Sequence, residues 1–324
     1  MDGCLRARLY SRSSAGWLRW REKIAAKFAG GAVPGNDKQT ILIISYTQRA
    51  GEVPGEGHLP GVSVTNGTSE TPELLGYEPT SRPIWLEAFF PVDWIALHVS
   101  PVYYGFGVPH GQGEPIVLVP GFMGSDRYLT EMHLWLRRIG YQPYFSGIGR
   151  NVDCPELLTQ RLLFTIEQAH DDTHQSVTII GHSLGGMLAR AAAHRAPSLV
   201  RQVITMGSPF RSVRAHPLVL SAANFVRSNI VRERRRRQEV TSTCFTPECS
   251  CGFVTTLKRD VEAENGFSGN FRRRAIYSKC DGVVDWRACV EDEEDLNTEV
   301  IATHIGMAFN PDVYRTLANL LAGG

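Results

Sequence analysis

A serine stands at the centre of the segment Gly-His-Ser-Leu-Gly, residues 181–185. The β-branched run before it, 177–180, is typical of a buried strand, and residues 187–193 are typical of a helix. Such a short strand-to-helix turn holds its central residue on strained backbone, with the side chain above the sheet edge. Both flanking glycines suit the bend because a Cβ at either position would collide across it. We therefore predict that Ser183 is a nucleophile.

A serine hydroxyl becomes a strong nucleophile only when a base takes its proton and a third group orients that base. Asp281 and His304 each come directly after a short run that we predict to be a strand. They follow Ser183 in the order serine, acid, histidine, which is one of the orders in which such triads occur. Asp285 is an alternative acid if its strand ends later. His182 lies inside the turn, and we expect it to pack or to form a hydrogen bond.

The elements that must position these residues alternate between strands and helices. We predict strands at 115–121, 141–148, 177–180, 200–206, 274–278 and 299–302, and helices at 126–138, 155–169, 187–193 and 311–321. This alternation predicts an α/β fold with a mostly parallel, doubly wound sheet. In such sheets the functional residues lie at the carboxyl ends of the strands.

The alternation is interrupted at about residues 211–270, before the predicted acid. We expect this insertion to form a cap over the carboxyl edge of the sheet. It contains no buried strand, and it holds the stretch 218–231 and an arginine-rich run at 232–237. In a chain with balanced charge, such a run is more typical of a solvated helix face than of a patch for anionic lipid or nucleic acid.

The N-terminal part of the chain differs in composition from the rest. Residues 51–71 are rich in Gly, Pro, Ser and Thr and offer little to bury. We therefore expect residues 1–84 to form a poorly ordered N-terminal extension. The domain is predicted to span 85–324 and to begin with the strongly apolar stretch 85–97.

Composition excludes several classes of protein. The 34 basic and 33 acidic residues give no field that would attract nucleic acid. No stretch approaches the roughly 20 apolar residues that span a bilayer. Residues 1–21 lack the apolar core of a secretory signal, so the sequence as read predicts a cytoplasmic protein, or a secreted one if the start codon is misassigned.

The chain has seven cysteines, of which Cys244, Cys249 and Cys251 are clustered. A zinc site is disfavoured because there is no CxxC pair and no histidine nearby. Reduced thiols and local disulfides both remain open, and disulfides would indicate an oxidising compartment.

Residues 114–321 resemble the α/β-hydrolase fold and, more narrowly, bacterial lipases and esterases of the triacylglycerol-lipase type. The resemblance is specific at Val-Pro-Gly-Phe (119–122), Gly-His-Ser-Leu-Gly-Gly (181–186), Ser-x-x-Asp-Gly-Val-Val (278–284) and Thr-His-Ile-Gly (303–306). It implies that Ser183 is the nucleophile, Asp281 the acid and His304 the base. It also implies that no cofactor or metal is needed.

Such a serine needs amide donors for the oxyanion that forms during the reaction. One should be the backbone N–H of Leu184, at the positive end of the helix that it begins. The resemblance implies that the other is the N–H of Phe122, in the turn 121–124. We expect the side chains of Phe122 and Met123 to line the acyl site.

These features predict a carboxylic-ester hydrolase, an esterase or a lipase, that cleaves lipophilic acyl esters through a serine acyl-enzyme. The expected partner is a small-molecule or lipid ester, with contact to a lipid interface through the cap. Two other classes remain open. The same triad would serve an acyltransferase if an alcohol outcompeted water, and the chain could be a non-catalytic binding protein on a hydrolase fold. The preferred acyl chain is also open.

Overall fold

The computed structural model describes residues 78–80, 82–236, 251–262 and 271–323, without the side chains of 78–79, 234–236 and 261–262. All of them belong to one compact unit of the chain, residues 71–324. Predictions about residues 1–77, and those about Cys244 and Cys249, lie outside the described residues. Among the described cysteines, Cys280 is disulfide-bonded and Cys289 is a free, buried thiol.

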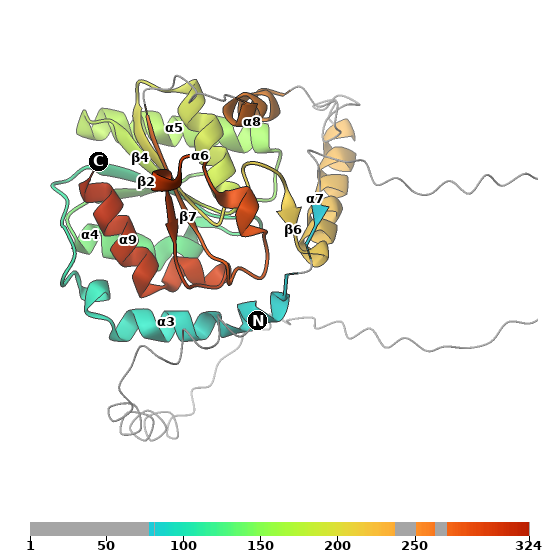
Figure 1. Ribbon diagram of the computed structural model, residues 1–324. Coiled ribbons are helices and arrows are strands. Elements are labelled where there is room, and N and C mark those ends of the chain that lie inside the picture. Colours follow the sequence, from blue (N-terminus) through green and yellow to red (C-terminus); the bar gives the residue numbers. More distant parts are fainter. Residues whose placement is uncertain (1–77, 81, 237–250, 263–270, 324) are drawn as a thin grey trace, which may run out of the picture. The chain divides into compact units, whose positions relative to one another are not determined.

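Six parallel strands form the central sheet of the described part, in the order β3-β2-β4-β5-β7-β8 (Figure 1). They are β2 (Pro115–Val119), β3 (Gln142–Phe145), β4 (Val177–His182), β5 (Val200–Met206), β7 (Arg272–Tyr277) and β8 (Asn297–Glu299). The predicted parallel sheet is confirmed.

The last strand, however, ends earlier than the predicted range 299–302. Just beyond it the Val300 N–H still donates to the Tyr277 carbonyl at 2.9 Å, but at Ala302 a side chain takes the place of the backbone ladder. The Ser278 hydroxyl donates to the carbonyl oxygen of Ala302 at 2.7 Å and accepts from its N–H at 3.3 Å. His304 therefore follows a short loop and not the strand itself.

Helices cover both faces of this sheet (Figure 1). Helices α5 (Pro155–Thr173) and α6 (Leu184–Arg195) lie on one face, and α4 (Thr130–Arg138) and α9 (Pro311–Ala322) lie on the other. Along β2, Ile116 and Leu118 pack into the core beneath α4 and α9, whereas the alternating valines pack beneath α5 and α6. Burial on both faces explains why the strand is continuously apolar, and the doubly wound α/β prediction is confirmed.

The inserted segment contains two helices with different positions. Helix α7 (Pro217–Arg236) lines a cavity beside Ser183. Helix α8 (Gly252–Glu262) instead packs against α5 and α6, where the Phe253 N–H donates to Glu156 at 2.7 Å. Both helices border the cavity, α7 along one wall and α8 through Phe253, and α8 also extends a helix layer.

The residues before the sheet form part of the same unit. The short strand β1 (Glu78–Pro79), inside the range predicted as an extension, pairs in parallel with β6 (Arg214–Ala215). After it come the 3₁₀ helix η1 (Ile84–Phe89), helix α3 (Phe90–Val99) and η2 (Pro101–Tyr104); the remaining 3₁₀ helices are η3 (Asp126–Leu129), η4 (Trp286–Cys289), η5 (Glu294–Leu296) and η6 (Ile305–Phe309). Helix α3 packs on η6, directly after His304. None of the helices in the described ranges has the length and apolar character needed to cross a membrane.

Candidate active site

Ser183 makes the turn between β4 and α6 by itself. Its φ of 54° and ψ of −126° lie in a region that side chains rarely adopt. A Cβ on Gly181 would overlap Gly186, and one on Gly185 would overlap the carbonyl of Val119. The predicted strand–turn–helix bend is therefore confirmed, and it raises the serine above the carboxyl end of β4.

Asp281 and His304 meet at the same edge of the sheet. The His304 Nδ1–H donates to Asp281 Oδ2 at 2.6 Å, and both side chains are buried. The other oxygen of Asp281 accepts the N–H groups of Val283 and Val284, each at 2.8 Å. With its Nδ1 proton directed to a fixed carboxylate, the neutral imidazole of His304 keeps Nε2 as a proton acceptor.

The alternative acid, Asp285, lies in different surroundings. Its carboxylate pairs with the guanidinium groups of Arg82 and Arg287 at 3.4 Å each and with that of Arg214 at 4.0 Å. The structure thus brings Asp281, and not Asp285, to the histidine.

The environment of His304 makes it a stronger base than an ordinary histidine. Burial by itself would lower its pKa, but the neighbouring Asp281 carboxylate and the nearby Glu87 carboxylate raise the pKa above its usual 6.5. The Ser183 hydroxyl makes no hydrogen bond to His304 within the described residues. Catalytic hydrogen bonds are often loose before substrate binds.

His182 is buried against His304. Its Nε2 bonds the carbonyl oxygen of His304 at 2.9 Å, and the two rings are 4.8 Å apart. Burial and the neighbouring His304 lower the pKa of His182 to about 3. His182 is therefore neutral near pH 7 and has the packing and hydrogen-bonding place that the sequence predicts.

The turn that follows β2 lies against the serine. A Cβ on Gly121 would be only 3.0 Å from the Ser183 Cβ. Two backbone hydrogen bonds join the turn to Asn151. The Met123 N–H donates to the Asn151 carbonyl at 3.0 Å, and the Asn151 N–H donates to the Gly124 carbonyl at 2.9 Å. Asn151, which the sequence did not single out, also donates its side-chain amide to the Pro120 carbonyl at 2.9 Å.

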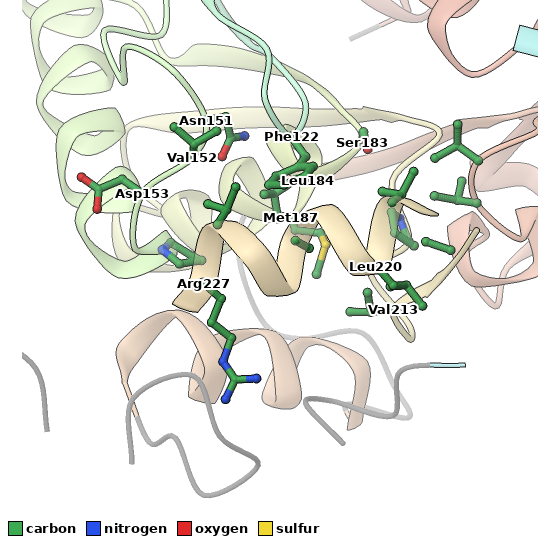
Figure 2. A pocket seen from close by; sticks show the side chains of 18 of the residues that line it. Phe122, Asn151, Val152, Asp153, Ser183, Leu184, Met187, Val213, Leu220 and Arg227 are labelled. Carbon is green, nitrogen blue, oxygen red and sulfur yellow. The ribbon is translucent and has the colours of Figure 1, made fainter. Parts of the chain in front are cut away.

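Of the three residues predicted for the oxyanion and acyl sites, two line the cavity beside Ser183 and one does not. Phe122 and Leu184 line a cavity with Ser183 (Figure 2), and Leu184 begins α6. Met123 has a positive φ of 61° and a 47% exposed side chain. It lies outside the lining of this cavity, so Phe122 borders the expected acyl site and Met123 does not.

The cavity beside Ser183 is apolar. Its volume is about 170 Å³, which exceeds the roughly 150 Å³ of an apolar cavity that holds benzene. One wall comes from the core, including Met187, and another from α7, through Val219, Leu220 and Ala223. Figure 2 shows Arg227 extending away from the other labelled side chains. The space suits a hydrocarbon chain more than a polar group.

Glu87 is a second site-proximal residue that the sequence did not single out. Its carboxylate accepts the backbone N–H groups of Gly282, His304 and Ile305. The available signal was the presence of two acids, Glu87 and Asp93, inside the apolar stretch 85–97, because a buried carboxylate is costly unless it has partners.

Comparison with known proteins agrees with this architecture. A family model described as the alpha/beta hydrolase fold matches residues 161–278. A triacylglycerol lipase of Pseudarthrobacter phenanthrenivorans is 32% identical over 106 residues, covering 30% of this chain and 33% of that enzyme. A triacylglycerol lipase of Burkholderia plantarii is 32% identical over the same length, covering 30% of each. The alignments thus span about a third of these relatives.

A solved lipase structure from Bacillus licheniformis aligns with a TM-score of 0.44 at 15% identity, covering 66% of this chain and 94% of that one. The chain has the α/β-hydrolase fold and is distantly homologous to bacterial triacylglycerol lipases and esterases.

Proposed function

We propose that the protein is a serine carboxylic-ester hydrolase that cleaves lipophilic acyl esters. The observation that carries the proposal is the 2.6 Å contact between Asp281 and His304, at the sheet edge where Ser183 occupies a strained strand-to-helix turn. A fixed acid, an imidazole of raised pKa and an elevated hydroxyl are the parts that acyl transfer requires.

In the proposed reaction, His304 Nε2 takes the proton of Ser183 as Oγ attacks the ester carbonyl. The oxyanion accepts the backbone N–H groups of Leu184 and Phe122, and the first of these has the positive end of α6 behind it. The imidazolium then protonates the leaving alcohol, which leaves an acyl group on Ser183. A water molecule repeats the sequence and frees the acid.

The apolar cavity supports the assignment of lipophilic acyl groups. Its walls from α7 and from Met187 would bury methylene groups, each worth roughly 0.8 kcal/mol. The homologous enzymes are named as triacylglycerol lipases, which supports acylglycerols among the substrates.

A panel of p-nitrophenyl esters from acetyl to palmitoyl, together with an emulsified triglyceride, tests the proposal. We expect the wild type to turn over esters, and we expect Ser183→Ala to be slower by at least about 10⁴-fold with an unchanged circular dichroism spectrum. Ser228→Ala is the matched control, because that hydroxyl is exposed on α7 and, in the part of the chain that the structure describes, bonds the Asn224 carbonyl alone. Undiminished turnover in Ser183→Ala would refute the mechanism.

The panel also separates the alternatives within the proposal. Activity on the emulsion would identify a lipase, and a steep fall beyond short chains would identify an esterase. Transfer to an added alcohol without release of free acid would identify an acyltransferase.

A further inference from the structure

Glu87 connects the loop of the candidate acid with the loop of the candidate base. We infer that it is a positioning residue for the Asp281–His304 pair, which makes the helical segment before the sheet part of the active site. The kinetic consequences rest on the proposed function, whereas the effect on His304 does not.

The geometry of Glu87 joins two segments through one side chain. Oε1 accepts the Gly282 N–H at 2.9 Å and the His304 N–H at 3.0 Å. Oε2 accepts the Ile305 N–H at 2.8 Å. Since Gly282 directly follows Asp281, movement of Glu87 would change the position of both members of the pair.

These contacts fit a carboxylate that acts through its charge. The side chain is 7% exposed, and all three partners are backbone N–H donors, which suits an acceptor-only, ionised group. No lysine or arginine pairs with Glu87 in the ranges that the structure describes. Burial raises the pKa of Glu87 above its usual 4.5, although the amides and the nearby His304 oppose that rise.

Several titratable groups surround His304. Asp281 approaches from the loop after β7 and Glu87 from η1, while His182 approaches from β4. Tyr128 of η3 donates its hydroxyl to the Ile305 carbonyl at 2.7 Å. Asp93 of α3 accepts from the Thr303 hydroxyl at 3.2 Å and is not among the charges that raise the pKa of His304.

Of these groups, Asp281 and Glu87 carry the negative charges that raise the pKa of His304 against the effect of burial. In the proposed reaction His304 becomes an imidazolium when it takes the proton of Ser183. The nearby negative charges of Asp281 and Glu87 stabilise that imidazolium. Without the charge of Glu87 the pKa of His304 would fall, and the acid limb of the pH–rate profile would move to lower pH.

Glu87→Gln tests this role because it keeps the shape of the side chain while removing its charge and placing an amide donor against one N–H donor. We expect kcat to fall about 10²-fold with KM little changed, as for a misplaced catalytic group. The acid limb of kcat/KM should move to lower pH.

Asp93→Asn is the matched control for loss of a buried carboxylate. Asp93 is 4% exposed and lies in the same N-terminal segment, but it bonds the side chains of Thr303 and Asn310. In Asp93→Asn the acid limb of the kcat/KM profile should stay at the wild-type pH. A role of Glu87 limited to anchoring this segment would lower stability in both variants and move the acid limb in neither, which would overturn the inference.

The imidazole of His304 can also be titrated directly by NMR of histidine-labelled protein, with its signal assigned by its loss in His304→Asn. Its pKa should be lower in Glu87→Gln than in the wild type, whether or not any ester is cleaved. A lowered pKa in a protein that cleaves no ester would refute the proposed function and support the inference. An active wild type with an unchanged pKa and unchanged kcat in Glu87→Gln would overturn the inference alone.

If Glu87→Gln does not fold, Glu87→Asp gives the same decision. This variant keeps the charge but is one methylene too short to reach all three amides, so kcat should fall with the pKa of His304 still raised. Wild-type kcat in Glu87→Asp would overturn the positioning role.

Discussion

Two groups of buried carboxylates differ in the partners that they have. Glu87 and Asp281 bond backbone amides, and Asp281 also bonds His304. Asp260 and Glu291 lie on the α6 and α8 side of the sheet and both bond the buried Arg190. Both groups are removed from water, but only the second has a guanidinium to balance its charge.

The balance of charge decides what each group can do. His194 and Arg190 hold the pKa of Asp260 at about 2, against the effect of burial, so its charge is fixed and neutralised. This cluster ties α8 to α6. Asp281 and Glu87 instead raise the pKa of His304. In this comparison the two buried carboxylates that bond backbone amides lie at the proposed chemistry, and the two that bond a guanidinium hold the structure together. Asp285, with its three arginines, belongs with the second kind.

The largest expected effect comes from Asp281→Asn. Loss of the charge and of the correct histidine tautomer should lower kcat about 10⁴-fold, with a smaller change in stability. Asp285→Asn removes an equivalent carboxylate four positions away and should change kcat little, because partly exposed ion pairs contribute little. Ester kinetics on both purified variants make the comparison, and equal losses would remove the distinction between the two kinds of carboxylate.

Arg190→Met should lower the stability of the protein and leave kcat nearly unchanged, which is the opposite of the result expected for Asp281→Asn. It leaves Asp260 and Glu291 buried without their main counter-charge, and breaking a buried pair in this way costs about 3–5 kcal/mol. Loss of the 3.9 Å stacking of the guanidinium on Phe210 adds to the effect. Urea unfolding should show the loss, while kcat per folded molecule stays near wild type. A large fall in kcat at unchanged stability would place the Arg190 cluster in the catalytic machinery.

The smallest effect is expected from the apolar wall, which holds no buried carboxylate. Ala223→Phe adds a ring to the α7 wall of the cavity and should lower the octanoate-to-acetate ratio of kcat/KM about tenfold. Phe225→Ala changes the exposed side of the same helix, where that ring is 69% exposed, and should leave the ratio unchanged. Equal changes in both variants would mean that α7 does not select the acyl chain through this cavity.

The sequence was sufficient where a local pattern determines the structure. The run 177–180, the glycines on both sides of Ser183 and the helical pattern after it specify a bend that only a few residues can make. The buried strands were recognisable for a similar reason, because burial on both faces leaves a continuous apolar run. Asp281 and His304 were identified by their places after such runs.

The sequence was insufficient where distant residues decide the structure. Glu87 and His304 are 217 positions apart, and nothing in either local pattern relates them. The end of β8 was placed too late because the apolar residues Val300–Ala302 look like a strand, although the Ser278 hydroxyl replaces part of the ladder there. Within the insertion that we predict as a cap, the packing of α8 on α5 and α6 depends on tertiary contacts that no sequence period reveals.

The central claim is that Ser183 carries the acyl group during turnover. A fluorophosphonate, which reacts with activated serines, followed by peptide mass spectrometry of the labelled protein, tests it most directly. We predict one adduct on the peptide that contains Ser183, at a rate that falls strongly in His304→Asn. Ester turnover without any adduct on Ser183, or an adduct formed equally fast without His304, would contradict the account.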